Sequence, residues 1–324
     1  MFRYFRHTAT GHSATNAYLC SVLAYHVYHQ PSLVNGNWHD AFNGLLQTLS
    51  VPGDPFTLDT IDVPTDPEMY ATDTQAAVIA NSDVIFVVFR GTASSTDWLN
   101  DLQHGLMALP FTEGGLPPGP LPPINGPHVH VGFWRALDTR YDDIRARVLT
   151  RRTQNQRIFV TGHSLGGALA ILCAYRLNRD PFLAVQGVYT FGSPRVGDPA
   201  FRDAYGSTLG NRTHRWIYNQ EFAAALPTLG PLGYGAFQPH PYAHLGRENF
   251  IAADGSVTMN RSYADPTVGA AWLIGVLPGL NADDHDLTRT CRRLRWRLSR
   301  RTRTSATNPS WLVRKDPAHA MSIF

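Results

Sequence analysis

The sequence is poor in charged residues and in cysteine. Only 16% of its 324 residues are charged and 43% are hydrophobic, a composition that excludes a disordered chain and a coiled coil. No uninterrupted apolar run approaches the roughly 18 residues of a membrane-spanning helix, so we expect none. The three cysteines, Cys20, Cys173 and Cys291, are too few and too widely spaced for a disulfide framework or a zinc site. A chain of this length accommodates one large α/β domain or two small ones.

Acidic residues are absent from the segment 289–315, which holds 10 of the 28 basic residues. Residues 1–288 hold 18 basic and 24 acidic residues, so a body with a net charge of −6 carries a basic C-terminal part. We expect this part to be a solvated helix and tail, with contact to an anionic membrane surface as the alternative. Binding to nucleic acid is not expected, because no recognised nucleic-acid fold accompanies the arginines.

The N-terminal segment has Arg3 and Arg6 before a partly apolar stretch, 17–28, that His26 interrupts. No small-x-small cleavage site follows clearly, so we expect a folded helix here rather than a signal peptide. The compartment stays unassigned on this basis, being either intracellular or reached by a non-standard export route.

Alternating helix and strand signals predict a parallel or mixed sheet covered by helices. The run Val84–Phe89 is continuously apolar, which is typical of a strand buried on both faces. Seven prolines in 110–127 predict a long surface loop, inserted within one domain that spans 1–298 and precedes a basic tail, 299–324. We expect helices at 12–30, 38–48, 132–152, 165–178, 199–205 and 283–298, and strands at 74–81, 83–90, 158–161, 185–191 and 214–218.

The segment with the clearest chemical signal is Gly162-His163-Ser164-Leu165-Gly166, between a predicted strand and a predicted helix. A serine on a sharp strand-to-helix turn projects its hydroxyl above the sheet, and small neighbours allow the strand and helix to approach closely. The helix N-terminus then directs N–H groups at a developing negative charge. We therefore expect Ser164 to be a nucleophile, with the Leu165 N–H and the backbone and hydroxyl of Thr92 forming an oxyanion hole.

Five motifs occur along the chain in a fixed order. They are Phe89-Arg90-Gly91-Thr92, Asp97-Trp98-Leu99-Asn100-Asp101-Leu102, Val129-His130-Val131-Gly132-Phe133, Gly162-His163-Ser164-Leu165-Gly166-Gly167 and Ser193-Pro194-Arg195-Val196-Gly197-Asp198. With these motifs the sequence resembles the filamentous-fungal, or class 3, lipase family over roughly residues 12–298. The resemblance implies an α/β-hydrolase fold with a mostly parallel central sheet, a Ser–His–acid triad, hydrolysis of carboxylic esters and a short lid at about 93–102.

The base and the acid of the triad should follow the serine along the chain, in the order Ser, acid, His. His285, at the start of the last predicted helix, resembles the catalytic histidine of the family, and His244 is the alternative base. Glu221 aligns with the family's aspartate when the Leu226-Pro227 pair is used as the reference point, and it is the expected acid. Asp265 and Asp283 remain alternatives.

These features predict a serine hydrolase of acyl esters, a triacylglycerol lipase or carboxylesterase that acts on lipid or small ester substrates. The alternatives are a phospholipase A1 acting on anionic membranes and a non-catalytic interaction protein on a lipase scaffold. The lid and the basic tail are candidates for contact with a lipid–water interface. We expect no cofactor and no metal, because His128-x-His130 supplies two potential ligands without an evident third.

Overall fold

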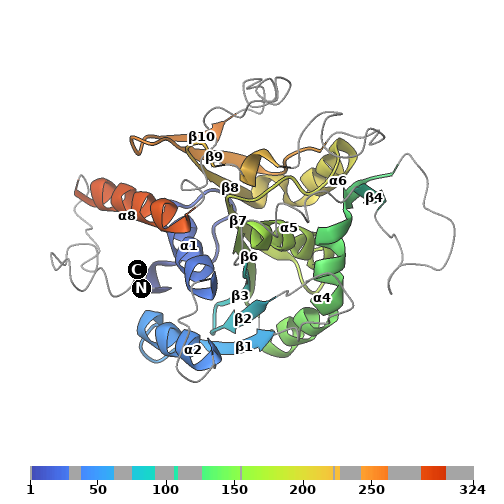
Figure 1. The fold of residues 1–324 in the computed structure, drawn as a ribbon. Coiled ribbons are helices and arrows are strands. Elements are labelled where there is room, and N and C mark those ends of the chain that lie inside the picture. The colour runs from blue at the N-terminus through green and yellow to red at the C-terminus, as the bar shows by residue number, and fades with distance from the viewer. Residues whose placement is uncertain are drawn as a thin grey trace.

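The centre of the protein is an eight-stranded sheet with the order β1-β2-β3-β6-β7-β8-β9-β10 (Figure 1). The computed structural model describes residues 2–28, 38–61, 75–91, 106–108, 126–153, 155–221, 223–226, 242–261 and 286–303. The strands of the sheet are β1 (Thr57–Ile61), β2 (Ala76–Ala80), β3 (Val84–Phe89), β6 (Arg157–His163), β7 (Val185–Phe191), β8 (Thr213–Tyr218), β9 (Arg247–Ile251) and β10 (Val257–Arg261).

The middle of this sheet is parallel and its edges are antiparallel. Strands β3, β6, β7, β8 and β9 pair in parallel, while β1 and β2 extend one edge and β10 the other in antiparallel fashion. A separate two-stranded sheet joins β4 (Leu106–Ala108) to β5 (His128–His130). The predicted mostly parallel sheet is therefore confirmed, and the carboxyl ends of its central strands meet at one edge.

Helices cover both faces of the sheet (Figure 1). One face carries α1, α2 and α8, and the other carries α4, α5 and α6, so the fold has three layers. No helix among the described segments is both long enough and apolar enough to cross a membrane. The helices are α1 (Ala14–Tyr28), α2 (Trp38–Leu49), α4 (Val131–Arg151), α5 (Leu165–Leu177), α6 (Pro199–Leu209) and α8 (Leu287–Arg303), with short 3-10 turns at Phe2–Tyr4, Gly210–Arg212 and Ala223–Ala225.

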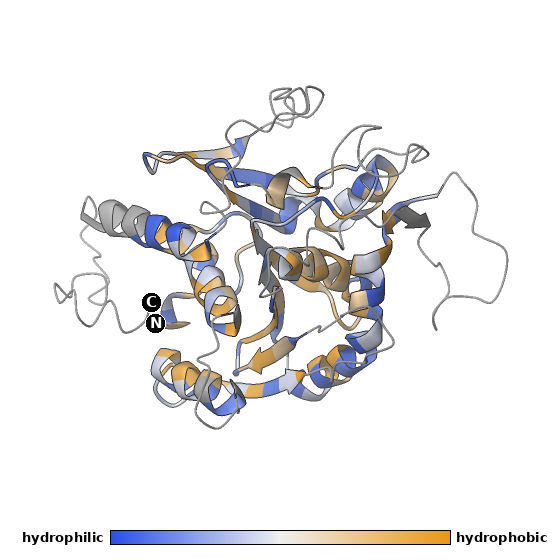
Figure 2. Cartoon of the chain, viewed as in Figure 1, coloured by the Kyte–Doolittle hydropathy of each residue, from blue (hydrophilic) through white to orange (hydrophobic). Residues whose placement is uncertain are grey.

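Strand β3 shows why the central strands read as unbroken apolar runs. All six of its residues are buried, and successive side chains enter opposite cores. Ile85, Val87 and Phe89 pack with α4 and α5, whereas Val84, Phe86 and Val88 pack with α1 and α2. Figure 2 shows the same apolar character over most of α5, which lies across the sheet.

Local signals in the sequence mark the helix start at α6. The Phe201 N–H donates to Asp198 Oδ1 at 2.7 Å, so Asp198 is the N-cap, and Pro199 occupies the first turn. The helix continues to Leu209, beyond the end predicted near Tyr205.

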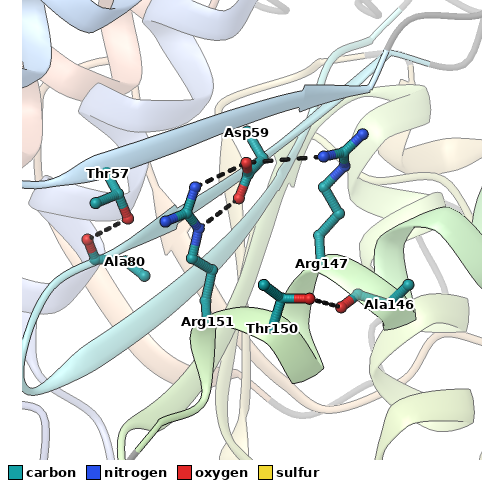
Figure 3. A network of polar contacts seen from close by, with 7 residues as sticks. All are labelled: Thr57, Asp59, Ala80, Ala146, Arg147, Thr150 and Arg151. Atoms are coloured by element: carbon teal, nitrogen blue, oxygen red, sulfur yellow. Dashed lines mark hydrogen bonds and ion pairs between the residues drawn. The ribbon is translucent and has the colours of Figure 1, made fainter.

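An ion pair fastens the edge strand β1 to helix α4 (Figure 3). Arg151 donates from Nε and Nη2 to the two carboxylate oxygens of Asp59, at 2.6 and 2.8 Å, and Arg147 lies 3.8 Å from the same carboxylate. Thr57 Oγ1 donates to the carbonyl of Ala80 on β2 at 3.1 Å. These contacts fix the outermost strand to the core and place charge on an otherwise exposed sheet edge.

Strands β1, β4, β5, β9 and β10 were not predicted from the sequence, and the limits of the last helix, like those of α6, differ from the predicted ones. Strands β1, β9 and β10 carry polar residues, which obscures their pattern. The last helix begins at Leu287, because Asp286 caps it by accepting the Thr288 N–H at 2.8 Å, and it continues to Arg303 rather than ending at 298. The expected lid, 93–102, lies outside the described residues, as does 110–125 of the proline-rich loop.

Candidate active site

Ser164 lies on the turn between β6 and α5, at the carboxyl edge of the parallel strands. Its backbone has φ 56° and ψ −129°, a left-handed conformation that a residue with a Cβ rarely adopts. Hydrogen bonds hold this turn, since the Ser164 N–H donates to the Phe191 carbonyl at 2.9 Å and the Gly167 N–H donates to the Ser164 carbonyl at 2.9 Å. The serine is 5% exposed, so its surroundings fix its position.

Glycines surround this serine because there is no room for a Cβ. A Cβ at Gly162 would lie 2.3 Å from the Gly166 carbonyl oxygen, and one at Gly166 would lie 2.6 Å from the Phe89 carbonyl oxygen. A Cβ at Gly167 would lie 2.8 Å from the Ser193 Cβ. This strand-to-helix turn, the nucleophile elbow, thus packs directly against the ends of β3 and β7, the arrangement expected for a serine held above a sheet.

Part of the expected oxyanion hole is described. Leu165 is the first residue of α5, so its N–H belongs to the first turn, where backbone donors have no partner within the helix. The backbone of Arg90 and Gly91 continues from β3 directly beside Gly166, and the Arg90 N–H donates to the Gln75 carbonyl at 3.0 Å. Thr92 lies outside the described residues.

Glu221 follows β8 at the same edge of the sheet as Ser164, because β6 and β8 run in the same direction. It is 4% exposed, and its Oε1 accepts the Tyr218 N–H at 2.8 Å. The turn includes Asn219 with φ 46°. A carboxylate is therefore held in one orientation here. His285, Asp265 and Asp283 lie outside the described residues.

His244 is buried among cations. Burial, together with Arg215 and Arg195, lowers the pKa of His244 well below its ordinary value. The imidazole is therefore uncharged near neutral pH, and these neighbours oppose its taking up a proton.

A buried ion cluster beneath this edge of the sheet was not predicted from the sequence. Arg215 on β8 donates from Nη2 to Glu248 Oε2 on β9 at 2.6 Å, and these two residues are partners in the strand register. Arg215 is fully buried and Glu248 is 6% exposed. Burial and the neighbouring Arg215 lower the pKa of Arg195 to about 10. Glu221 also acts electrostatically on Arg215, so two arginines and two glutamates share this interior.

The histidines of the His128-x-His130 segment have structural partners. His128 Nδ1 lies 2.9 Å from Asp198 Oδ2 and so connects β5 to the cap of α6. His130 caps α4 by accepting the Phe133 N–H at 3.3 Å, and its ring stacks on Phe133 with 4.0 Å between centroids. Within the described part of the chain, no group of three His, Cys, Asp or Glu residues is placed to hold a metal ion.

Comparisons with known proteins agree with this geometry. The model of the family described as "Lipase (class 3)" matches residues 86–230, which include the elbow and Glu221. A lipase of Rhizomucor miehei is 32% identical over 202 residues, which are 61% of this chain and 50% of that protein. A phospholipase A1-II of Oryza sativa subsp. japonica is 32% identical over 185 residues, covering 51% of this chain and 44% of that protein.

A solved structure also shares this fold. It belongs to a triacylglycerol lipase whose catalytic centre is described as a serine protease triad, and it superimposes with a TM-score of 0.60 at 25% identity. The superposition covers 84% of this chain and 92% of that one. The segments matched in the two curated relatives span half or less of those proteins' lengths.

Proposed function

Because the chain belongs to the class 3 lipase family of the α/β-hydrolase superfamily, we propose that it is a serine hydrolase that cleaves acyl esters. The observation that carries this proposal is the strained serine at φ 56°, enclosed by glycines between a buried strand and a helix. Such strain persists only where the surrounding structure enforces it, and it is characteristic of nucleophile elbows. The names of the relatives support lipids or other acyl esters as substrates.

The proposed reaction uses side chains, backbone N–H groups and water. Ser164 Oγ attacks the ester carbonyl carbon while His285 takes the hydroxyl proton, which it then gives to the departing alcohol. Water, deprotonated by the same histidine, attacks the acyl-enzyme. The bond from the acyl carbon to Ser164 Oγ then breaks, the histidine returns the proton to Oγ, and the carboxylic acid leaves. The N–H groups of Leu165 and Thr92 stabilise the tetrahedral oxyanion, and removing one such donor typically lowers the rate about a hundredfold or more.

We assign Glu221 as the acid that orients His285. Its burial and its bond from the Tyr218 N–H supply the fixed orientation that this role requires. The uncharged state of His244 beside two arginines favours His285 over His244 as the base. Asp265 and Asp283 are the competing acids. Glu221→Gln should lower kcat strongly, whereas Asp265→Asn and Asp283→Asn should leave kcat near that of the wild type; the reverse pattern would move the role to an aspartate.

Triacylglycerols or simpler carboxylic esters are the proposed substrates, with phospholipids as the second candidate. The rice phospholipase A1 relative and the arginine-rich C-terminal part favour that second candidate. Residues 93–102, as a lid, and the basic tail, 299–324, are the proposed contacts with a lipid–water interface.

Hydrolysis of p-nitrophenyl esters with short and long acyl chains tests the proposal. Ser164→Ala should abolish turnover and labelling by a fluorophosphonate probe, and Ser207→Ala, on the exposed surface of α6, should retain both. Release of fatty acid from phosphatidylcholine distinguishes the phospholipase. A wild-type protein that hydrolyses no ester and takes no label, with or without lipid present, would favour the non-catalytic scaffold instead.

A further inference from the structure

Helix α8 is a long, strongly basic element that the proposed chemistry does not use. It holds eight arginines and no acidic residue in 17 positions. It begins two residues after His285, so its first turns, with Arg289 and Arg292, adjoin the candidate catalytic base along the chain. Asp286 fixes its start by capping the Thr288 N–H, so the helix has a defined beginning and register.

Among the described side chains of α8, those at 287, 290, 291 and 294 are buried against the body. Leu287, Cys291 and Leu294 are 0–2% exposed and lie in the core shared with α1. Cys291 Sγ donates to Ser21 Oγ on α1 at 3.2 Å. Since these positions recur every three or four residues, they define one stripe of the helix and fix which side turns outward.

The outward side of α8 carries exposed arginines. Arg289 and Arg292 are exposed and Arg293 is half-buried, and Figure 2 shows hydrophilic and hydrophobic residues alternating in the coloured part of the helix. Arg293 Nη2 also donates to the Ala253 carbonyl at 2.9 Å. Arg289 and Arg292 form an arginine face on the side of the helix away from Leu287, Cys291 and Leu294. In the sequence the helix continues with Trp296 and four more arginines, at 297, 300, 301 and 303.

We propose that this arginine face of α8 binds an anionic phospholipid surface. Eight cations on a helix whose own body has a net charge of −6 form a local field that attracts polyanions. Tryptophan among arginines is the composition of helices that lie in the membrane interface, where the ring inserts at the headgroup level. The choice of lipid over another polyanion rests on the proposed function, whereas the charge argument does not.

Vesicle sedimentation tests this surface without any turnover. The protein is the full chain carrying Ser164→Ala, and the probes are phosphatidylcholine vesicles with and without phosphatidylglycerol. We expect binding to the anionic vesicles only, weakening as salt rises. Each arginine near an anionic surface contributes about fivefold in affinity, so Arg289→Gln with Arg292→Gln should weaken binding about 30-fold. The matched control, Arg135→Gln with Arg202→Gln on α4 and α6, removes two exposed charges elsewhere and should change little.

Three results would overturn the proposal. Equal binding to neutral and anionic vesicles would remove the charge argument, and equal loss in the α8 and control variants would show that the effect depends on net charge rather than on this face. Duplex DNA that displaces the protein from anionic vesicles at equal phosphate concentration would indicate a nucleic-acid site. Because the background variant is inactive, each result is independent of whether the protein hydrolyses esters.

Discussion

Replacing Ser164 by glycine should stabilise the protein while removing its proposed nucleophile. The serine has φ 56° and ψ −129°. The other described residues with positive φ and a side chain are Asn219 and Asn260, and asparagine tolerates left-handed conformations far better than serine does. Ser164 therefore holds backbone strain that only its Cβ creates. Ser164→Ala keeps this Cβ and removes only the hydroxyl, so it is the proper reference.

The size of the gain follows from three opposing quantities. Strain in so unfavourable a region costs up to about 3 kcal/mol, and glycine relieves it. Glycine also raises the entropy of the unfolded chain, which lowers stability by up to about 1 kcal/mol. Loss of one buried methyl group relative to alanine removes about 0.8 kcal/mol more. The net expectation is that Ser164→Gly is more stable than Ser164→Ala by on the order of 1 kcal/mol.

Urea unfolding, followed by circular dichroism at neutral pH, measures this difference as a shift in midpoint. Ala170→Gly, in the interior of α5, serves as the control, because glycine there relieves no strain and should lower stability by about 1 kcal/mol. If Ser164→Gly unfolds at the same or a lower urea concentration than Ser164→Ala, the backbone of residue 164 is not strained enough to lower the stability of the protein.

Three further perturbations test the surroundings of the site. Gly166→Ala places a Cβ 2.6 Å from the Phe89 carbonyl oxygen, so it should lower the free energy of unfolding by about 2 kcal/mol or more, as measured by urea unfolding. The same variant should lose labelling by the fluorophosphonate probe. Glu248→Ala leaves the Arg215 charge buried without its closest carboxylate and should lower the free energy of unfolding by about 3–5 kcal/mol in urea titrations. Glu248→Gln should lower it less, and equal stability of the two variants would contradict this expectation. Burial lowers the pKa of His214 to about 3. Below about pH 6.5 this histidine is therefore protonated in the unfolded chain but stays neutral in the folded one. Stability should fall by up to about 5 kcal/mol as pH drops from 6.5 toward 3, and His214→Gln should flatten that dependence in unfolding titrations.

The parts of the fold that the sequence predicted are those set by local chemistry. Strand β7 was expected at 185–191 and runs from Val185 to Phe191, because most of its residues are β-branched or aromatic and favour a strand. The start of α6 followed from Asp198 and Pro199, whose cap and fixed φ act within one turn. Strand β9, by contrast, begins Arg247-Glu248-Asn249. Its polar residues become strand only because β8 and β10 pair with it.

The residues of the site also fall into two groups, those that nearby sequence predicts and those that only the folded structure brings together. Ser164 was found from its neighbours along the chain, and Glu221 from its distance to the Leu226-Pro227 pair. The ion pair of Arg215 and Glu248 was not found, because its partners are 33 residues apart and meet only through the register of β8 with β9. An arginine inside the predicted strand 214–218 was the available signal, since a buried guanidinium requires a partner.

The glycines of the elbow are needed for spatial reasons rather than for turn propensity. Gly162 faces the carbonyl of Gly166 in the helix that follows, Gly166 faces the end of β3, and Gly167 faces Ser193 beyond β7. Each glycine therefore permits a different close approach, and together these approaches position one serine against two neighbouring strands and its own helix. A Cβ at any of them displaces a different element, so the three substitutions should disturb the same serine by separate routes. This explains how a short motif locates a site whose geometry depends on segments more than 70 residues apart in the chain, from Phe89 to Ser164.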